Sequence, residues 1–212
     1  MARRTKQDAQ ATRAAVLDAA ECVFLRRGVA HTSLAEIAQA AGVTRGAIYG
    51  HFENKTDLFA AMMERVTLPL ETEIAEIAQT AQASAPAGDV LAQLRERAQI
   101  AIGQIVDDEQ TRRVIEIAML MVEHVDELGE LRTRRAQTEQ AVVTRFALIL
   151  TEAARQRGTP LPAAATALAR GLHALLFGLI HHWLLERGFD LTTEARQIMD
   201  AYLRGIGLPP AP

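Results

Sequence analysis

The most informative pattern of apolar and polar positions lies in residues 32–55, TSLAEIAQAAGVTRGAIYGHFENK. Apolar residues fall at i, i+3, i+4 and i+7 from Leu34, which places them on one face of a helix. Ser33 and Glu36 fit a capping box at its start, and Gly42 follows where a residue without Cβ ends a helix cheaply. Thr44 can cap a second helix over residues 45–51. The pattern predicts two short helices joined by a tight turn.

The second of these helices has an unusual composition. It carries a cation, Arg45, the phenol of Tyr49 and the imidazole of His51, together with Gly46 and Gly50. Each glycine costs up to ~1 kcal/mol relative to alanine in a helix, so a helix kept for stability alone has little reason to carry two. Glycines fit a backbone that approaches a phosphate closely, and a helix-turn-helix places its second helix in the DNA major groove. Physical grounds leave an ordinary helical hairpin open as the alternative.

The string VTRGAIYGHFENKTDLF closely resembles the recognition helix and following turn of TetR-family repressors. The opening ARRTKQDAQATRAAVLDAA and the later TRRVIEIAMLMVEHVDELGELRTRR resemble segments of the AcrR-like multidrug-efflux subgroup. That subgroup usually has tryptophan where this chain has Gly50. The resemblance implies a repressor that binds double-stranded operator DNA as a dimer, holds a hydrophobic effector in its C-terminal part, and regulates efflux pump genes.

The remaining periodic segments are also helical, and alanine and leucine dominate the chain. We expect an all-α fold, with an N-terminal three-helix helix-turn-helix domain over residues 1–55 and a larger helical ligand-binding and dimerisation domain over 56–212. Residues 1–9 are expected to be a flexible arm, and the first helix to span 10–27. A long helix follows, which Pro69 should bend or break. Five C-terminal helices are predicted, over residues 89–106, 110–122, 127–157, 162–186 and 192–204, the last capped by Thr192 or Thr193.

The predicted DNA-binding residues are Ser33, Thr44, Arg45, Gly46, Ala47, Tyr49, Gly50, His51 and Lys55. Lys55 stands at a helix N-terminus, which together with a lysine suits a phosphate. Charge supports this placement: the chain has a net charge of −3, but residues 1–55 hold eight Lys/Arg against five Asp/Glu, or +3, which leaves −6 for the remainder.

The predicted helix over 162–186 is apolar on more than one face, and such a helix needs cover on all sides. A second copy of the chain is the expected cover, although a monomer core helix is the alternative. The expected dimer-interface residues are Leu176, Leu179, Ile180, Trp183 and Leu203.

An apolar pocket between helices is the usual form of a small-molecule site in a helical protein, and methionine repacks easily around different ligands. The proposed wall residues are Met62, Met63, Met119, Phe146, His173 and Phe177, each of which is individually more typical of plain core.

No dinucleotide, phosphate-loop, zinc-protease or nucleophile-elbow motif occurs, so no enzyme, cofactor or metal site is expected. The single cysteine, Cys22, excludes an intrachain disulfide and is expected to be a small buried thiol. No signal peptide is evident, and the apolar run over 171–185 falls short of the ~20 residues needed to cross a bilayer, so a cytoplasmic protein is expected. The alternatives are a helical protein-interaction adaptor without DNA binding and a TetR-like regulator of other metabolic genes.

Overall fold

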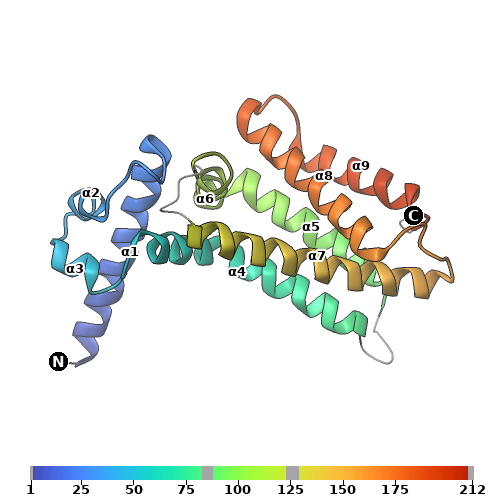
Figure 1. Cartoon of the computed structure of the whole chain (residues 1–212), viewed down its shortest axis with the longest axis horizontal. Helices are drawn as coiled ribbons and strands as arrows, with labels where there is room; N and C mark the ends of the chain where they lie inside the picture. Colours follow the sequence, from blue (N-terminus) through green and yellow to red (C-terminus); the bar gives the residue numbers. More distant parts are fainter. Residues whose placement is uncertain (1, 83–87, 123–128, 210–212) are drawn as a thin grey trace. The chain divides into compact units, whose positions relative to one another are not determined.

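The computed structural model describes residues 2–82, 88–122 and 129–209, and these residues form helices joined by turns (Figure 1). This confirms the all-α prediction. The helices are α1 (Ala2–Arg27), α2 (Leu34–Ala40), α3 (Arg45–Tyr49), α4 (Lys55–Gln82), α5 (Val90–Asp107), α6 (Glu109–Leu120), α7 (Gly129–Arg157), α8 (Ala165–Glu186) and α9 (Leu191–Gly205).

Packing divides the chain into two compact units. The first comprises Met1–Thr67 and Gln110–Arg134, and the second Leu68–Glu109 and Arg135–Pro212. The first unit therefore includes the start of α4 and nearly all of α6, beyond the residue 55 at which the sequence suggested a boundary. The functional division at that residue remains a prediction, because compactness alone does not assign a function to either segment.

The first unit is organised around α1, with α2 and α3 packed beside it (Figure 1). Side chains cap the starts of α2 and α4 in this unit. Ser33 and Glu36 form both halves of the capping box at α2, and the Asn54 side chain accepts the Asp57 amide at 2.8 Å at the start of α4. Gly42 adopts a left-handed φ of 67°, which lets the chain leave α2 without the clash that a Cβ would cause. Its core consists of Val16, Leu17, Ala20, Val23, Phe24, Val29, Leu34, Ile37, Ala38, Ile48, Phe52, Leu58, Phe59, Ala61, Met62, Val114 and Ile117.

Helix α1 is longer than predicted. Residues 2–9, expected to be a flexible arm, form its first turns. The segment contains neither glycine nor proline, and it runs directly into the apolar face that anchors the rest of the helix. Cys22 is exposed on α1, so the expectation of a buried thiol is wrong. Its position is one residue past Glu21, on the solvent side of the helix.

Two further details of the helices differ from expectation. Pro69 does not break α4, which runs from Lys55 to Gln82 as one helix, and a bend at this residue stays a prediction. The cap of α9 is Asp190 instead of Thr192 or Thr193. Its carboxylate accepts both the amide and the hydroxyl of Thr193, at 3.1 and 2.6 Å, and a carboxylate is a better acceptor than a hydroxyl at a helix N-terminus.

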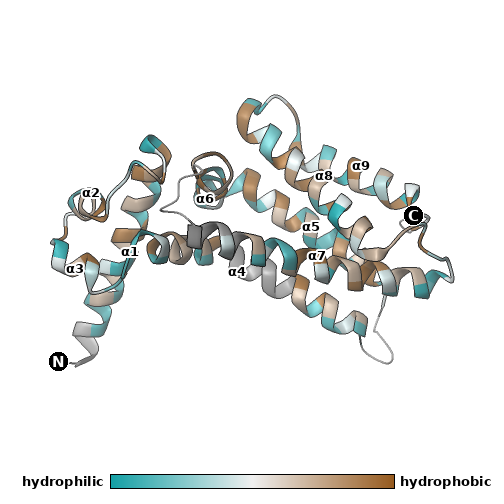
Figure 2. Cartoon of the chain, viewed as in Figure 1, coloured by the Kyte–Doolittle hydropathy of each residue, from teal (hydrophilic) through white to brown (hydrophobic). Residues whose placement is uncertain are grey.

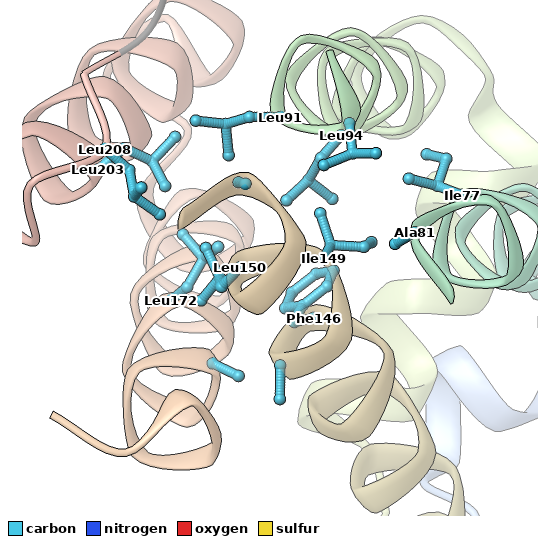
Figure 3. Packing of buried hydrophobic residues seen from close by; sticks show 14 of the residues in the cluster. Ile77, Ala81, Leu91, Leu94, Phe146, Ile149, Leu150, Leu172, Leu203 and Leu208 are labelled. Atoms are coloured by element: carbon cyan, nitrogen blue, oxygen red, sulfur yellow. The ribbon is translucent and has the colours of Figure 1, made fainter. Parts of the chain in front are cut away.

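The core of the second unit lies among parts of α4, α5, α7, α8 and α9 and the end of the chain after α9 (Figure 3). Leu150, Leu172 and Leu203 point toward one another in this core. Two ion pairs join helices around this core. Arg95 of α5 binds Asp200 of α9 through two hydrogen bonds of 2.8 and 2.9 Å, and Arg157 donates to Asp89 at 2.9 Å.

Hydrophobic residues occur along much of the length of α8 (Figure 2). Among the described residues, this helix alone is long and apolar enough to cross a membrane, a criterion that core helices of other proteins also meet. The finding differs from the expectation that the apolar run is too short, because the helix starts at Ala165 and reaches 22 residues. Only 22% of its most apolar window is buried within the chain, so α8 leaves apolar surface for a partner.

Candidate nucleic-acid interface

Helix α3 is held to its unit by a single side chain. Ile48 is fully buried, and no other residue of this five-residue helix is. Arg45 and Gly46 are exposed, Ala47 is half-buried, and Tyr49 is 59% exposed. Gly50, at the end of the helix, is exposed as well. The sequence therefore folds into a helix that shows almost its entire surface to solvent.

The turn between α2 and α3 fixes the direction of α3. The Val43 amide donates to the Ala38 carbonyl at 3.0 Å, which closes the turn after Gly42. The hydroxyl oxygen of Thr44 then accepts the Ala47 amide at 3.2 Å, as an N-cap does. Thr44 is exposed, and its hydroxyl hydrogen can still donate to an external acceptor such as a phosphate.

Neither glycine near α3 is required by the fold. Gly46 and Gly50 have ordinary negative φ values, and Gly50 adopts φ −73°. A Cβ added at Gly46 would meet the Thr44 hydroxyl oxygen at 3.9 Å, and one at Gly50 would meet the Ala47 carbonyl oxygen at 3.4 Å. Side chains would fit at both positions, which supports the view that these glycines serve an external contact.

The remaining predicted contact residues lie near α3, and they differ in how far contacts within the chain already occupy their side chains. The Ser33 hydroxyl is occupied by the capping box, where it donates to Glu36 at 2.8 Å. His51 is half-buried beside the ring of Phe52, with ring centroids 6.3 Å apart. Lys55 reaches back to the loop after α1 and donates to the Ala30 carbonyl at 2.9 Å. An ammonium has three donors, so this bond leaves Lys55 able to bind a phosphate as well.

Glu36 also ties α2 to α1. Hydrogen bonds from the backbone and hydroxyl of Ser33, and the nearby Arg27 guanidinium, lower the pKa of its carboxyl below the usual value. Arg27 donates to this carboxylate directly. The carboxylate thus holds the start of α2 against the end of α1. The position of α2 in turn determines where α3 lies, because a tight turn joins the two helices.

The first unit contains a buried acid that the sequence analysis did not identify. Glu21 of α1 is 1% exposed, and its carboxylate faces Arg65 of α4 with Gln110 and Arg113 of α6. Burial raises the pKa of Glu21, and hydrogen bonding from Gln110 and the charge of Arg65 act in the opposite direction. A glutamate directly after Ala20 on the apolar side of α1 was the available signal. It joins three helices of one unit.

The six predicted pocket residues fall into both units. Met62 is fully buried in the core of the first unit, where Met63 and Met119 are half-buried. In the second unit Phe146 belongs to the core, and the rings of His173 and Phe177 stack with centroids 5.8 Å apart. The structure thus brings His173 and Phe177 into contact, and the use of all six as pocket walls stays a prediction.

The predicted dimer-interface residues divide in a similar way. Leu176, Leu179 and Ile180 are half-buried on α8. Trp183 is largely buried, and the Arg187 guanidinium lies over its ring at 5.1 Å from the centroid. Leu203 is fully buried inside the second unit, so within one chain it offers no surface to a partner, and the interface residues stay a prediction. Its place on the inner face of α9 explains this burial.

Comparison with known proteins agrees with the geometry of α2 and α3. Residues 16–62 match the family described as "Bacterial regulatory proteins, tetR family", and residues 89–207 match the "MAATS-type transcriptional repressor, C-terminal region". The chain is 36% identical over 212 residues to the HTH-type transcriptional regulator TtgR of Pseudomonas putida, which covers 100% of this chain and 99% of TtgR. It is 36% identical over 208 residues to AcrR of Shigella flexneri, which covers 96% of this chain and 94% of AcrR.

Solved structures show the same relationship. NalD, the secondary repressor of the MexAB-OprM multidrug efflux pump in Pseudomonas aeruginosa, superposes with a TM-score of 0.80 at 35% identity, over 94% of this chain and 98% of NalD. The SmeT–triclosan complex gives a TM-score of 0.79 at 31% identity, over 95% and 98%. The chain therefore belongs to the tetR family of bacterial regulatory proteins, and it is a DNA-binding transcriptional repressor and not an enzyme.

Proposed function

We propose that this chain represses genes of a multidrug efflux pump and leaves its operator when a hydrophobic small molecule binds the second unit. The observation that carries the DNA-binding part is the exposure of α3, with Arg45, Tyr49 and Gly50 outward and Ile48 alone buried. Full-length similarity to TtgR and AcrR, and to the efflux repressors NalD and SmeT, supports the choice of target genes. A TetR-like regulator of other metabolic genes is the second candidate.

On DNA, Arg45, Ala47, Tyr49 and Gly50 face base edges or the sugar-phosphate backbone in the major groove. Thr44, Tyr49, His51 and Lys55 grip phosphates, which set the register without reading sequence. Ser33 and Gly46 complete the surface. Because both glycines accept a Cβ in the folded chain, their absence of side chains serves the close approach of the helix to the duplex.

The chain acts as a homodimer, since one helix-turn-helix covers few bases and two half-sites one helical turn apart multiply affinity. The apolar surface of α8 supports this state: Leu185 is 61% and Leu175 40% exposed, next to half-buried Leu176, Leu179 and Ile180. Covering this surface with a second copy also accounts for a helix of membrane-like composition in a protein that works on DNA. The proposed dimer is cytoplasmic.

The effector is hydrophobic and occupies the second unit near Phe146, His173 and Phe177. Burial lowers the pKa of His173, against the opposing charge of Glu139, so its imidazole is neutral near pH 7 and suits an uncharged ligand. Triclosan, the ligand in the SmeT complex, is a suitable first probe. Binding shifts α4, which is shared by both units, and changes the separation of the two recognition helices. Affinity falls in proportion to the effector's preference for the non-binding state.

The test is fluorescence anisotropy of a labelled duplex from upstream of the protein's own gene, titrated at two salt concentrations with and without triclosan and a panel of hydrophobic antibiotics. Saturable, salt-sensitive binding that one compound releases is the expected result. Binding that no compound releases would contradict the effector part alone. A duplex bound no better than random DNA of equal length would contradict this assignment of the regulated genes, and Arg45→Ala, with its fold checked by circular dichroism, is the matched control.

A further inference from the structure

An arginine that sequence reasoning did not assign lies beside the recognition helix. The guanidinium carbon of Arg13, on α1, stands 5.2 Å from the centroid of the Phe52 ring. Phe52 follows α3 by three residues and is 2% exposed, so its position is fixed by the core. Arg13 itself is exposed. A buried ring next to α3 therefore holds an exposed cation at the side of that helix.

Arg13 belongs to a stripe along α1. Lys6, Gln10 and Arg13 are spaced i, i+4 and i+7, so they share one face of the helix, and all three are exposed. The same face continues through Val16, Leu17 and Ala20, which are buried in the core. Over its C-terminal part this face packs within the unit. Over the N-terminal part of α1 the same face lies beyond the core and carries the polar and basic residues Lys6, Gln10 and Arg13.

The charges around this stripe leave it cationic. Asp8 and Asp18 are each five residues from Arg13, which turns them about 140° away around the helix. Asp18 is moreover paired with Arg65 at 2.7 Å. Within the described part of the chain no ion pair involves Lys6 or Arg13. An arginine stacked on an aromatic ring keeps the N–H groups at its edge free to bind an anion.

We propose that Lys6, Gln10 and Arg13 form a second phosphate-binding surface on α1, which grips the DNA backbone alongside the site that α3 reads. The proposal rests on the proposed DNA binding of α3 and adds residues outside the helix-turn-helix. α1 contacts α3 within one compact unit, so both surfaces move together as a single body. Phe52 positions Arg13, and Arg13 and Lys6 supply the charge.

The experiment measures the affinity of the full chain for a labelled duplex from upstream of its own gene, and for a random duplex of equal length, over a series of salt concentrations. The variants are Arg13→Gln, Lys6→Gln and Arg13→Lys. Arg26→Gln is the matched control, because Arg26 is an exposed arginine of the same helix that bonds the Cys22 carbonyl. Thermal unfolding of each variant checks the fold.

Removing one phosphate contact lowers the magnitude of the salt slope by about one. We expect this change for Arg13→Gln and for Lys6→Gln on both duplexes, and no change for Arg26→Gln. Arg13→Lys keeps the slope because it keeps the charge. Unchanged slopes for Arg13→Gln and Lys6→Gln would overturn the proposal and leave Arg13 as a cover for Phe52. Lys6→Gln decides the matter if Arg13→Gln fails to fold. Failure of the proposed function itself shows separately, as an unmodified chain that binds neither duplex.

Discussion

The Arg65 guanidinium donates to the buried carboxylate of Glu21 at 3.0 Å, and by this bond α4 is fixed to α1 within the first unit. The same oxygen accepts Gln110 at 3.1 Å, and Arg113 approaches the other oxygen at 3.5 Å. Helix α6 lies outside residues 1–55, yet two of its side chains share this carboxylate. A single acid of α1 thus connects both α4 and α6 to the unit that presents α3.

Replacing Arg65 with alanine removes a charged, hydrogen-bonded partner of a buried carboxylate. Breaking a buried ion pair costs about 3–5 kcal/mol when one ion is left without compensation. Because Arg113 and Gln110 still face Glu21, we expect a loss of about 2–3 kcal/mol in the free energy of unfolding, measured by urea denaturation. Arg26→Ala is the control and should leave stability unchanged. A loss no greater than the control's would mean that the remaining two partners satisfy Glu21.

Asp89 makes the stability of the second unit depend on pH. Burial acts to raise the pKa of its carboxyl, but hydrogen bonds from the Ala92 amide, Arg157 and the Leu91 amide lower it below the model-peptide value of 3.8. The folded state therefore binds this proton less readily than the unfolded state. The stabilisation is complete above the unfolded pKa and is lost as pH falls through the folded one.

Asp89→Asn should keep an N-cap but lose this acid-sensitive contribution. We expect its stability curve, from denaturant titrations between pH 6 and pH 3, to fall less steeply at the acid end than that of the unmodified chain. Parallel curves would show that Asp89 titrates alike in both states.

Gly171 of α8 is required by Tyr202 of α9. A Cβ at Gly171 would lie 2.6 Å from the Tyr202 hydroxyl oxygen, which donates to the Leu168 carbonyl at 2.7 Å. Gly171→Ala should therefore destabilise the chain by about 1–3 kcal/mol, as overpacking does. Tyr202→Phe alone should cost about 1 kcal/mol for the lost hydrogen bond.

The two substitutions should be less than additive, because Tyr202→Phe removes the atom that Gly171→Ala strikes. A double-mutant cycle by thermal or denaturant unfolding measures this coupling. Full additivity would rule out the contact as the reason for the glycine.

Gly50→Trp restores the residue usual in the AcrR-like subgroup. Since Gly50 is exposed with φ −73° and has room for a Cβ, the variant should fold with an unchanged melting temperature. Its affinity for the operator should change, as measured by anisotropy on the duplex from upstream of the gene. Identical affinity would place Gly50 away from DNA. Ile100→Trp, on an exposed position of α5 in the other unit, controls for the added indole.

Lys55→Gln tests whether the ammonium has a role beyond its bond to Ala30. Loss of a phosphate contact would lower the magnitude of the salt slope by about one, evenly across duplex sequences. Loss of the Ala30 bond would instead lower stability by about 1 kcal/mol. We expect both effects. A stability loss with an unchanged slope would leave Lys55 with a structural role only.

The local features were predictable from the residues alone: the capping box of Ser33 and Glu36, the helix end at Gly42, the cap at Thr44 and the helical fold. Each of these features depends on residues within one or two helical turns of each other, so it can be predicted from neighbouring residues in the sequence. Much of the family resemblance rests on this same segment, with the opening of the chain and residues 111–135 as further support.

Tertiary structure decided what depends on residues far apart in the chain. Glu21 becomes a buried charge because Arg65, Gln110 and Arg113 reach it from two other helices, and no local pattern encodes that meeting. Leu203 turned out to be core because α9 packs its inner face against α5 and α8, while apolar spacing alone suits core and interface equally. Arg13 gained its place beside α3 from the ring of Phe52, thirty-nine residues later in the chain.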